Sequence, residues 1–256
     1  MRKNKKYYIR KSHRYLGLFI GIQFIAWTIS GLYFSWTNLD EIHGDHFLQS
    51  PQYLSADIAT VSPDKVLASL KENHIVDSIS SFQLIRILDI PYYQIKYFSN
   101  SSEKKQSVTT EYALANAQTG ELRPPITKEE ATLIAKEQVI HPAKLKEVEY
   151  LEEAGSHHEF RGRRLPVWAV TFEEPACAVY VSPESGTFQT IRHSKWRIFD
   201  FLWMFHTMDY AGRDNFNNWL LRIFSVFGLI TVVSGFTLYV ATSKTFKKTT
   251  SKRQVN

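Results

Sequence analysis

Histidine is the residue type in this sequence best suited to bind iron or a cofactor, and three of the nine histidines are placed to act together. His43 and His46 closely follow a long apolar stretch, and His206 shortly precedes a second one. A neutral imidazole ligates iron and haem without help from thiolates. If two antiparallel helices bring these positions together, His206 could face His43 or His46 across an iron ion or a b-type haem. The alternative is that the three imidazoles cap helices or pair with Asp45 and Asp209.

Three other histidines need separate treatment. His13 lies at the far end of the first apolar stretch, so it cannot belong to the same ligand set. A position at the membrane surface among basic residues is favoured for it, and a partner histidine from another subunit or protein is the alternative. His157 and His158 lie in a polar segment, where a solvated hairpin tip is favoured over a weak metal site.

The motifs of the common enzyme classes are missing from the sequence. It contains no His-Glu-x-x-His, no Gly-x-Ser-x-Gly, no phosphate-binding glycine loop and no dinucleotide fingerprint. The single cysteine, Cys177, excludes an internal disulfide, a thiolate zinc site, an iron-sulfur cluster and a covalently attached c-type haem. We therefore predict no catalytic residue and at most a redox role, with Cys177 as a small buried strand residue.

Two apolar stretches are long enough to cross a membrane as helices. Leu16 to Trp36 contains 21 residues without a charge, and Ile223 to Ala241 contains 19. A helix of about 20 residues spans the hydrocarbon core of a bilayer. Trp36 and Trp219 flank the stretches, as in the aromatic belts of membrane proteins. These features predict two transmembrane helices rather than the buried core helices of a soluble protein.

The first apolar stretch is interpreted as an uncleaved signal anchor. It is longer than the apolar core of a cleavable signal peptide, which has roughly 7 to 15 residues. It ends in Tyr33, Phe34 and Trp36 rather than in small residues, and no Ala-x-Ala-like cleavage site follows.

The positive charge is concentrated at the two ends of the chain. The net charge is +6, but residues 1–14 hold seven Lys or Arg and residues 244–256 hold five, with no acid in either segment. The remainder holds 19 basic and 25 acidic residues. Basic segments beside apolar helices stay in the cytoplasm during insertion, so both termini are predicted to be cytoplasmic and the acidic middle to lie outside. Nucleic-acid binding loses its main support, because the central region is not basic.

The central region contains a repeat with an offset of 65 residues. Ser62-Pro63-Asp64-Lys65 precedes a short amphipathic segment, and Thr127-Lys128-Glu129-Glu130, a Thr-x-x-Glu capping box, precedes another. Three runs with strand-like alternation follow each of them. These runs are 81–88, 92–98 and 111–117 in the first copy, and 144–151, 167–172 and 178–181 in the second. The copies close on Thr119-Gly120-Glu121-Leu122 and Ser185-Gly186-Thr187-Phe188.

The repeat predicts an α+β region between the two transmembrane helices. It would consist of two helix-plus-three-strand antiparallel modules, joined at Arg123-Pro124-Pro125. Catalytic constellations are usually asymmetric, so a duplication of this kind favours a binding or packing scaffold over an enzyme.

The second copy and both apolar stretches resemble a known family. Arg164-Leu165-Pro166-Val167-Trp168-Ala169-Val170, followed by Tyr180-Val181-Ser182-Pro183-Glu184-Ser185-Gly186, is similar to the PepSY module. His13-Arg14-Tyr15-Leu16-Gly17 in the first stretch and Ser234-Gly235 in the second extend the similarity to the PepSY-associated transmembrane proteins. The resemblance implies a bacterial inner-membrane protein with two PepSY-like modules in the periplasm.

The resemblance also implies candidate functions. Larger relatives include iron-regulated membrane proteins and siderophore reductases, some of which hold haem between helices by histidines. The PepSY module is named for a proposed peptidase-inhibiting role. A binding or accessory role in iron, haem or siderophore handling is therefore implied. The alternatives are a haem-bearing electron-transfer or ferric-siderophore reductase subunit, and a regulator or inhibitor of an exported peptidase.

Two further features concern the membrane and its partners. Residues 196–206 carry aromatic side chains on most of a helical surface, which predicts an amphipathic helix in the membrane surface, with a core helix of the outer domain as the alternative. Gly17 and Gly21 form a Gly-x-x-x-Gly face that could join the two spans or two copies of the chain. Gln23 is expected to hold helices together by a hydrogen bond.

The predicted organisation has eight segments and three kinds of partner. The segments are a basic cytoplasmic tail (1–14), transmembrane helix 1 (15–37), a periplasmic linker (38–60), PepSY-like module 1 (61–123), PepSY-like module 2 (124–193), an interfacial amphipathic helix and loop (194–215), transmembrane helix 2 (219–242) and a second basic cytoplasmic tail (243–256). The expected partners are the lipid bilayer, another membrane or periplasmic protein and, through Gly17 and Gly21, a second copy of the chain.

Overall fold

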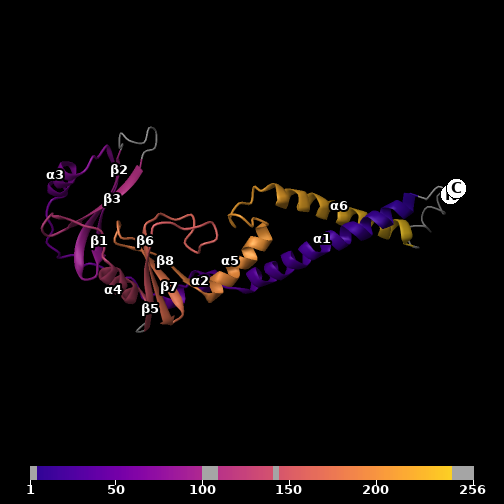
Figure 1. Cartoon of the computed structure of the whole chain (residues 1–256), viewed down its shortest axis with the longest axis horizontal. Coiled ribbons are helices and arrows are strands. Elements are labelled where there is room, and N and C mark those ends of the chain that lie inside the picture. The colour runs from indigo at the N-terminus through magenta and orange to yellow at the C-terminus, as the bar shows by residue number, and fades with distance from the viewer. Residues whose placement is uncertain (1–4, 100–108, 141–143, 244–256) are drawn as a thin grey trace. The chain divides into compact units, whose positions relative to one another are not determined.

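The structure is a computed structural model that describes residues 5–99, 109–140 and 144–243. The chain forms two compact units, each described by itself below (Figure 1). The helical unit combines Met1–Asn38 with Ile198–Asn256, and the sheet unit comprises Leu39–Arg197. The prediction of a mixed helix and sheet protein with an apolar helix at each end is confirmed.

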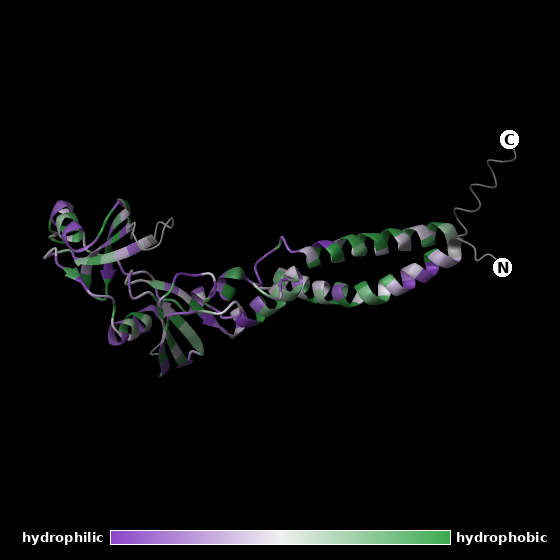
Figure 2. Ribbon diagram, turned by 45° about the horizontal axis from the view of Figure 1, so that its top comes forward, coloured by the Kyte–Doolittle hydropathy of each residue, from purple (hydrophilic) through white to green (hydrophobic). Residues whose placement is uncertain are grey.

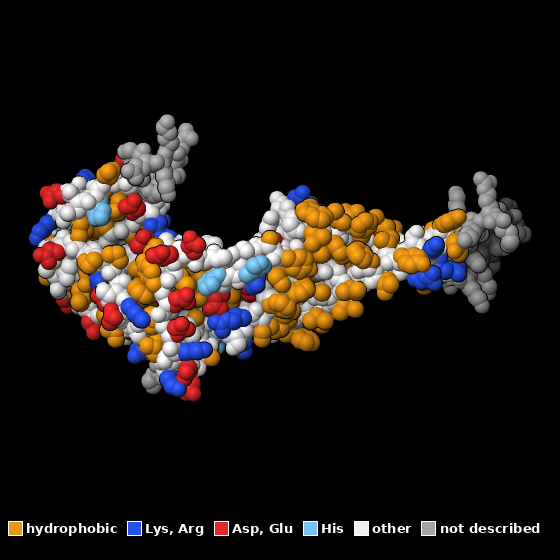
Figure 3. Space-filling model, in the orientation of Figure 1, with side chains coloured by type: hydrophobic (Ala, Val, Ile, Leu, Met, Phe, Trp, Pro, Cys, Tyr) orange, Lys and Arg blue, Asp and Glu red, His pale blue; other side chains and the backbone are white. Residues whose placement is uncertain are grey.

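Two long apolar helices, α1 (Lys5–Trp36) and α6 (Trp219–Thr242), make up most of the helical unit. Both are long and apolar enough to cross a membrane. Figure 2 shows the polar residues of α1 near its start, and Figure 3 shows hydrophobic side chains gathered over both helices. Leu18 and Ile22 are each 72% exposed. A soluble protein would bury such side chains, so this surface suits lipid.

Glycines on the two helices have different surroundings. A Cβ atom on Gly228 or Gly235 would lie 3.1 Å from an aromatic ring atom of α1, so both glycines lie where the helices pack closely. Around Gly17 and Gly21, by contrast, no described neighbour lies within 4 Å of that position. The Gly17 and Gly21 face is therefore not used in packing α1 against α6.

Side chains of α1 hold the last turn of α5 (Ser194–Thr207). The Gln23 amide donates to the carbonyl of Phe205 at 3.1 Å, and the Trp27 indole donates to the carbonyl of His206 at 3.0 Å. The last carbonyls of a helix have no partner within it, and an unpaired carbonyl is costly away from water. Gln23 thus joins two helices, as expected of a polar side chain within a span.

A tight loop after α5 is organised by two acidic residues. Asp209 accepts hydrogen bonds from the backbone N–H groups of Gly212 at 3.1 Å and Asn215 at 2.9 Å. Asp200, which is only 5% exposed, forms an ion pair with Arg213. These contacts fix the path of the chain from α5 to α6.

The sheet unit contains two four-stranded antiparallel sheets, not the two three-stranded sheets that the repeat predicts. The first sheet joins, in this order, β1 (Ser78–Ile87), β2 (Ile90–Ser99), β3 (Thr109–Asn116) and β4 (Leu122–Arg123). The second joins β5 (Lys144–Leu151), β6 (Val167–Glu174), β7 (Cys177–Val181) and β8 (Phe188–His193). Helix α3 (Pro63–Asn73) precedes the first sheet, and α4 (Lys128–Gln138) precedes the second.

The two additional strands follow the turns that were predicted to close the copies. After the first turn, two residues return to pair with Leu114 and Ala115 of β3. After the second, β8 pairs with β7. A run of two residues has no recognisable alternation, and β8 mixes polar and apolar residues without a strict period. The prediction of three strands per copy is therefore wrong by one strand in each.

Both helices of the sheet unit begin at the predicted caps. The Ser62 side chain accepts from the N–H of Asp64, with Pro63 in the first turn of α3. Thr127 and Glu130 form a reciprocal capping box at the start of α4. Each cap satisfies N–H groups that have no partner within the helix.

The two sheets do not have separate cores. One core cluster includes Val66 and Leu70 of α3 together with residues of the first sheet, among them Ala113. A larger cluster contains side chains of α4 and the second sheet, but it also includes Ile87 and Leu114 of the first sheet. Successive residues of β3 thus enter different cores, because side chains alternate across a strand.

The turn between β7 and β8 packs against the first sheet. Gly186 has a φ of +69°, and a Cβ atom there would lie 2.5 Å from Cδ1 of Ile87 and 3.0 Å from Cδ1 of Leu114. The Gln94 side-chain amide donates to the carbonyl of Ser185 at 2.6 Å. Glycine is the residue that permits both this φ and this close approach.

Candidate functional site

His206, one of the three predicted iron ligands, lies in the last turn of α5 within the helical unit. Its Nδ1 hydrogen-bonds to the Ser30 hydroxyl at 2.9 Å. Its ring lies 5.5 Å from that of Phe34 and 6.5 Å from that of Trp203, with which it is nearly parallel. Because the bond to Ser30 uses Nδ1, Nε2 is the ring atom left to ligate iron.

Burial favours the form of His206 that binds metals. Helix α5 is not one of the two helices long and apolar enough to span the membrane. Burial lowers the pKa of His206 below its ordinary value, because the charged imidazolium loses solvation. The neutral imidazole, which is the form that ligates iron, is therefore favoured at neutral pH.

His43 and His46, the other two predicted ligands, lie in the sheet unit. His43 ends α2 (Leu39–His43), His46 lies in the short helix η1 (Asp45–Phe47), and both are exposed. The His46 ring contacts that of Phe47, with 4.1 Å between centroids. His206 belongs to the other unit, so the structure describes the three histidines in two separate units. Their joint ligand role stays a prediction.

A fourth histidine, His193, lies beside His46 and carries no sequence signal. It is 2% exposed, and its ring lies 5.5 Å from that of His46. Its Nε2 donates to the carbonyl of Ile42 at 3.1 Å, and burial lowers the pKa of His193. His193 thus holds α2 against β8. Among the described residues, no group of three or more His, Cys, Asp or Glu could hold a metal ion.

The other histidines singled out in the sequence have local partners. Nδ1 of His13 hydrogen-bonds to the Ser234 hydroxyl at 2.8 Å, near the start of α1. Nδ1 of His158 accepts a hydrogen bond from a backbone N–H two residues later, at 3.1 Å. His13 and His206 are therefore held alike, each through Nδ1 by a serine of another helix of the helical unit.

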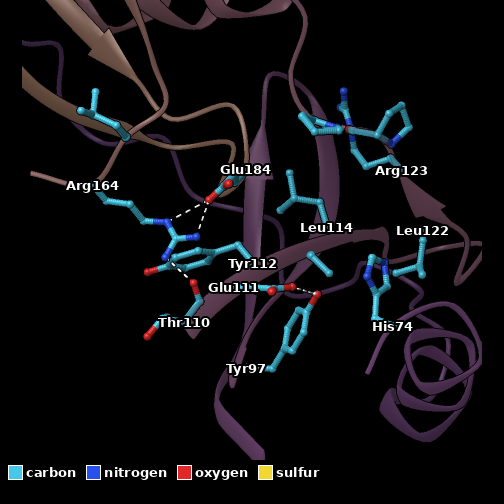
Figure 4. A pocket seen from close by; sticks show the side chains of 14 residues that line it. His74, Tyr97, Thr110, Glu111, Tyr112, Leu114, Leu122, Arg123, Arg164 and Glu184 are labelled. Atoms are coloured by element: carbon cyan, nitrogen blue, oxygen red, sulfur yellow. Dashed lines mark hydrogen bonds and ion pairs between the residues drawn. The ribbon is translucent and has the colours of Figure 1, made fainter. Parts of the chain in front are cut away.

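The sheet unit contains a cleft of 680 Å³ beside β3 (Figure 4). Its walls come from the first sheet, the end of α3 and the loops around the second sheet. The residues used below that line it are Tyr97, Tyr112, Leu122, Arg123, Arg164 and Glu184. None of the predicted iron ligands is among the residues of the cleft.

Arg164 forms one polar wall of the cleft. Its guanidinium pairs with the Glu184 carboxylate at 2.7 Å and donates to the carbonyl of Thr110. It also lies over the ring of Tyr112, 5.2 Å from the centroid (Figure 4). Contacts to three different segments hold the planar guanidinium in one orientation.

Two further polar pairs border the cleft. The Tyr97 hydroxyl donates to the Glu111 carboxylate at 2.8 Å. Burial raises the pKa of Tyr97 above its ordinary value and the bond to Glu111 raises it further, so the phenol stays protonated and donates at neutral pH. On the other side, Arg123 pairs with Glu130 at 2.6 Å.

This arrangement is suited to binding. The charged groups described above are paired with one another, so the cleft offers a fixed polar lining rather than an acid or base available for proton transfer. Its volume falls within the usual range for clefts that bind small ligands or short peptides. The only cysteine, Cys177, is buried in β7, where burial raises the pKa of the thiol to about 11, so it is not a reactive group.

The sequence carries little sign of this cleft. Thr110 and Glu184 lie 54 and 20 residues from Arg164 along the chain, and no local pattern connects them. The one available signal is that Arg164 and Glu184 both fall within the stretches that resemble the PepSY module.

Comparison with protein families gives a match over nearly the whole chain. The family described as PepSY-associated TM region matches residues 10–256. The match includes both apolar helices and the entire sheet unit. No curated protein and no solved structure matches the chain.

Proposed function

Because this chain belongs to the family of PepSY-associated transmembrane proteins, we propose that it is a membrane-anchored binding protein. Helices α1 and α6 hold it in the bilayer, and the sheet unit binds a ligand or a partner protein in the cleft. The observation that carries the proposal is the cleft itself. Segments far apart in the sequence build its walls, and two ion pairs fix its polar lining.

The proposed location is the inner membrane of a bacterium, with both termini in the cytoplasm and the sheet unit in the periplasm. Residues 1–14 and 244–256, which are basic and free of acids, support this orientation. The cleft would then face the periplasm, where exported proteins and incoming nutrients are found.

The proposed role is accessory, in the handling of iron, haem or siderophores. It is supported by the resemblance to larger membrane proteins with such roles. A regulator or inhibitor of an exported peptidase is the alternative, and the name of the module supports it. Both roles use the cleft as a binding surface, so one experiment distinguishes them.

That experiment is photo-cross-linking in living cells. A photoreactive phenylalanine replaces His74, which lines the cleft, or Tyr53, which is 85% exposed and does not line it. The His74 variant is expected to form a discrete adduct that the Tyr53 variant does not form. An iron or siderophore transport component in the adduct would support the first role, and a peptidase the second. Adducts at both positions or at neither would contradict binding in the cleft.

Electron transfer by a bound haem is a second candidate function, favoured by the way His206 is held. Ser30 takes Nδ1 and leaves Nε2 for iron, while the rings of Phe34 and Trp203 offer apolar contact to a porphyrin. His43 or His46 is the proposed second ligand. A haem bound there would supply one-electron chemistry.

The haem proposal predicts a spectrum. Full-length protein purified in detergent from haem-replete cells is expected to show a Soret band and a reduced-minus-oxidised difference. His206→Ala is expected to abolish both signals, because the ligand is lost. His157→Ala, which removes an exposed histidine outside the proposed set, should leave them unchanged. A folded sample without a Soret band would end the haem proposal.

A homodimer through Gly17 and Gly21 is also proposed. The open space around both glycines supports it, because small residues on an uncovered face allow another helix to approach closely in lipid.

A further inference from the structure

Part of β3 lacks a neighbouring strand on one side. β3 pairs with β2 along its whole length, but with β4 only at Leu114 and Ala115. The N–H of Asn116 donates to the carbonyl of Glu121, so even-numbered residues of β3 direct their backbone groups toward the β4 side. The backbone groups of Tyr112 therefore point the same way, and in the described part of the chain no strand pairs with them.

Two prolines explain why β4 is short. β4 ends at Arg123, and Pro124 and Pro125, which follow, have no N–H to donate to β3. Just beyond them, the N–H of Ile126 donates to the carbonyl of Pro183, in the second sheet's turn. The chain thus leaves β3 and exposes its edge to the cleft.

The other outer strands described here are modified in ways that discourage pairing. β1 has a register shift between Ile79 and Ser81. β5 has two register shifts and begins with the alternating charges of Lys144, Lys146 and Glu147. Bulges and charges are common protections of sheet edges. β3 has no register shift against either neighbour, so its open edge is regular.

The charges of the cleft do not select an ionic ligand. Arg164 is neutralised by Glu184 at 2.7 Å, and Arg123 by Glu130 at 2.6 Å. A small anion would have to compete with these carboxylates. The groups that remain to be satisfied are the backbone N–H and C=O of Tyr112, which recognise another backbone.

We propose that the edge of β3 between Thr110 and Leu114 binds an extended polypeptide segment, which adds to the first sheet as a strand. This proposal rests on the proposed function, since it names the ligand class of the same cleft. The segment would run antiparallel to β3, in line with β4, and one of its residues would exchange two hydrogen bonds with Tyr112. Arg164 marks the end of the site, because its guanidinium already occupies the carbonyl of Thr110.

The test uses the full-length protein in detergent and a synthetic library of random decapeptides. The tightest-binding peptide is resynthesised with one backbone amide methylated at a time. Methylation of every second amide is expected to weaken binding about tenfold, because only alternate N–H groups of a strand face its neighbour. Methylation of the intervening amides is expected to leave binding unchanged.

A pair of variants tests the same contact from the protein side. Tyr112→Pro removes the N–H that faces the peptide but none that pairs with β2, and is expected to weaken binding about tenfold. Tyr112→Val removes the phenol and keeps the N–H, so it is the matched control. Hydrogen exchange of β2 shows whether each variant keeps the sheet.

The outcomes separate this proposal from the proposed function. If a peptide binds but its methylation has no period of two, and the two variants weaken binding equally, side chains recognise the peptide. The strand proposal is then wrong, and the binding function stands. If no peptide of the library binds, the strand proposal is again wrong, while the His74 adduct decides the binding function independently.

Discussion

Gly186→Ala is expected to lower the free energy of unfolding of the sheet unit by about 3 kcal/mol. Two costs add at this position. The residue has a φ of +69°, which is unfavourable for any side chain with a Cβ atom. The new methyl group would also lie 2.5 Å from Ile87 and 3.0 Å from Leu114, which are both buried in the shared core. Hydrogen exchange of β6 peptides, measured by mass spectrometry, reports the sheet unit separately from the helices.

Gly162→Ala is the matched control. Gly162 has the same φ of +69°, but no described atom lies within 4 Å of the position of its Cβ. It therefore carries the backbone cost without the clash, and a loss of about 1 kcal/mol is expected. The difference between the two variants measures the packing of the turn against the first sheet. Equal losses would show that the turn does not pack there in solution.

Asp200→Asn is expected to destabilise the helical unit by about 3 kcal/mol, because it leaves a largely buried guanidinium without its counter-charge. The side chains of Asp200 and Arg213 are 6% and 19% exposed, and they form an ion pair. The substitution keeps the shape of the side chain and removes only its charge. The midpoint of thermal unfolding in detergent is the measurement, and it should fall clearly below that of the unaltered chain.

Removal of both charges separates the ion pair from the packing around it. The double variant Asp200→Leu with Arg213→Met leaves no unpaired charge, so it is expected to be more stable than Asp200→Asn. If Asp200→Asn leaves the midpoint unchanged, the ion pair contributes nothing to the loop. If the double variant is the least stable, shape rather than charge dominates at this position.

The parts of the fold that follow from the sequence are those with local causes. The two apolar stretches are set by composition over about 20 residues, and a capping box is visible within four. Both kinds of prediction agree with the structure, as at Thr127 and Glu130. The fourth strand of each sheet depends on pairing with a distant partner. β4, with two residues, has no pattern of its own to reveal it.

The candidate sites differ in the same way. His206 was singled out by residue type and by its place near an apolar helix, and its contact with Ser30, 176 residues away, appears only in the structure. The cleft depends on Arg164 reaching Thr110 and Glu184 from three separate segments. No spacing rule connects such residues, because the contact exists only after the two sheets have packed together.

The core shared by the two sheets has a consequence for how this protein can be divided. Ile87 and Leu114 come from the first copy of the repeat but complete the interior built on the second. A fragment limited to either copy would present this apolar surface to water and would be expected to aggregate. The ancestral halves have become a single cooperative piece, and a mutation in one half should be felt throughout the other.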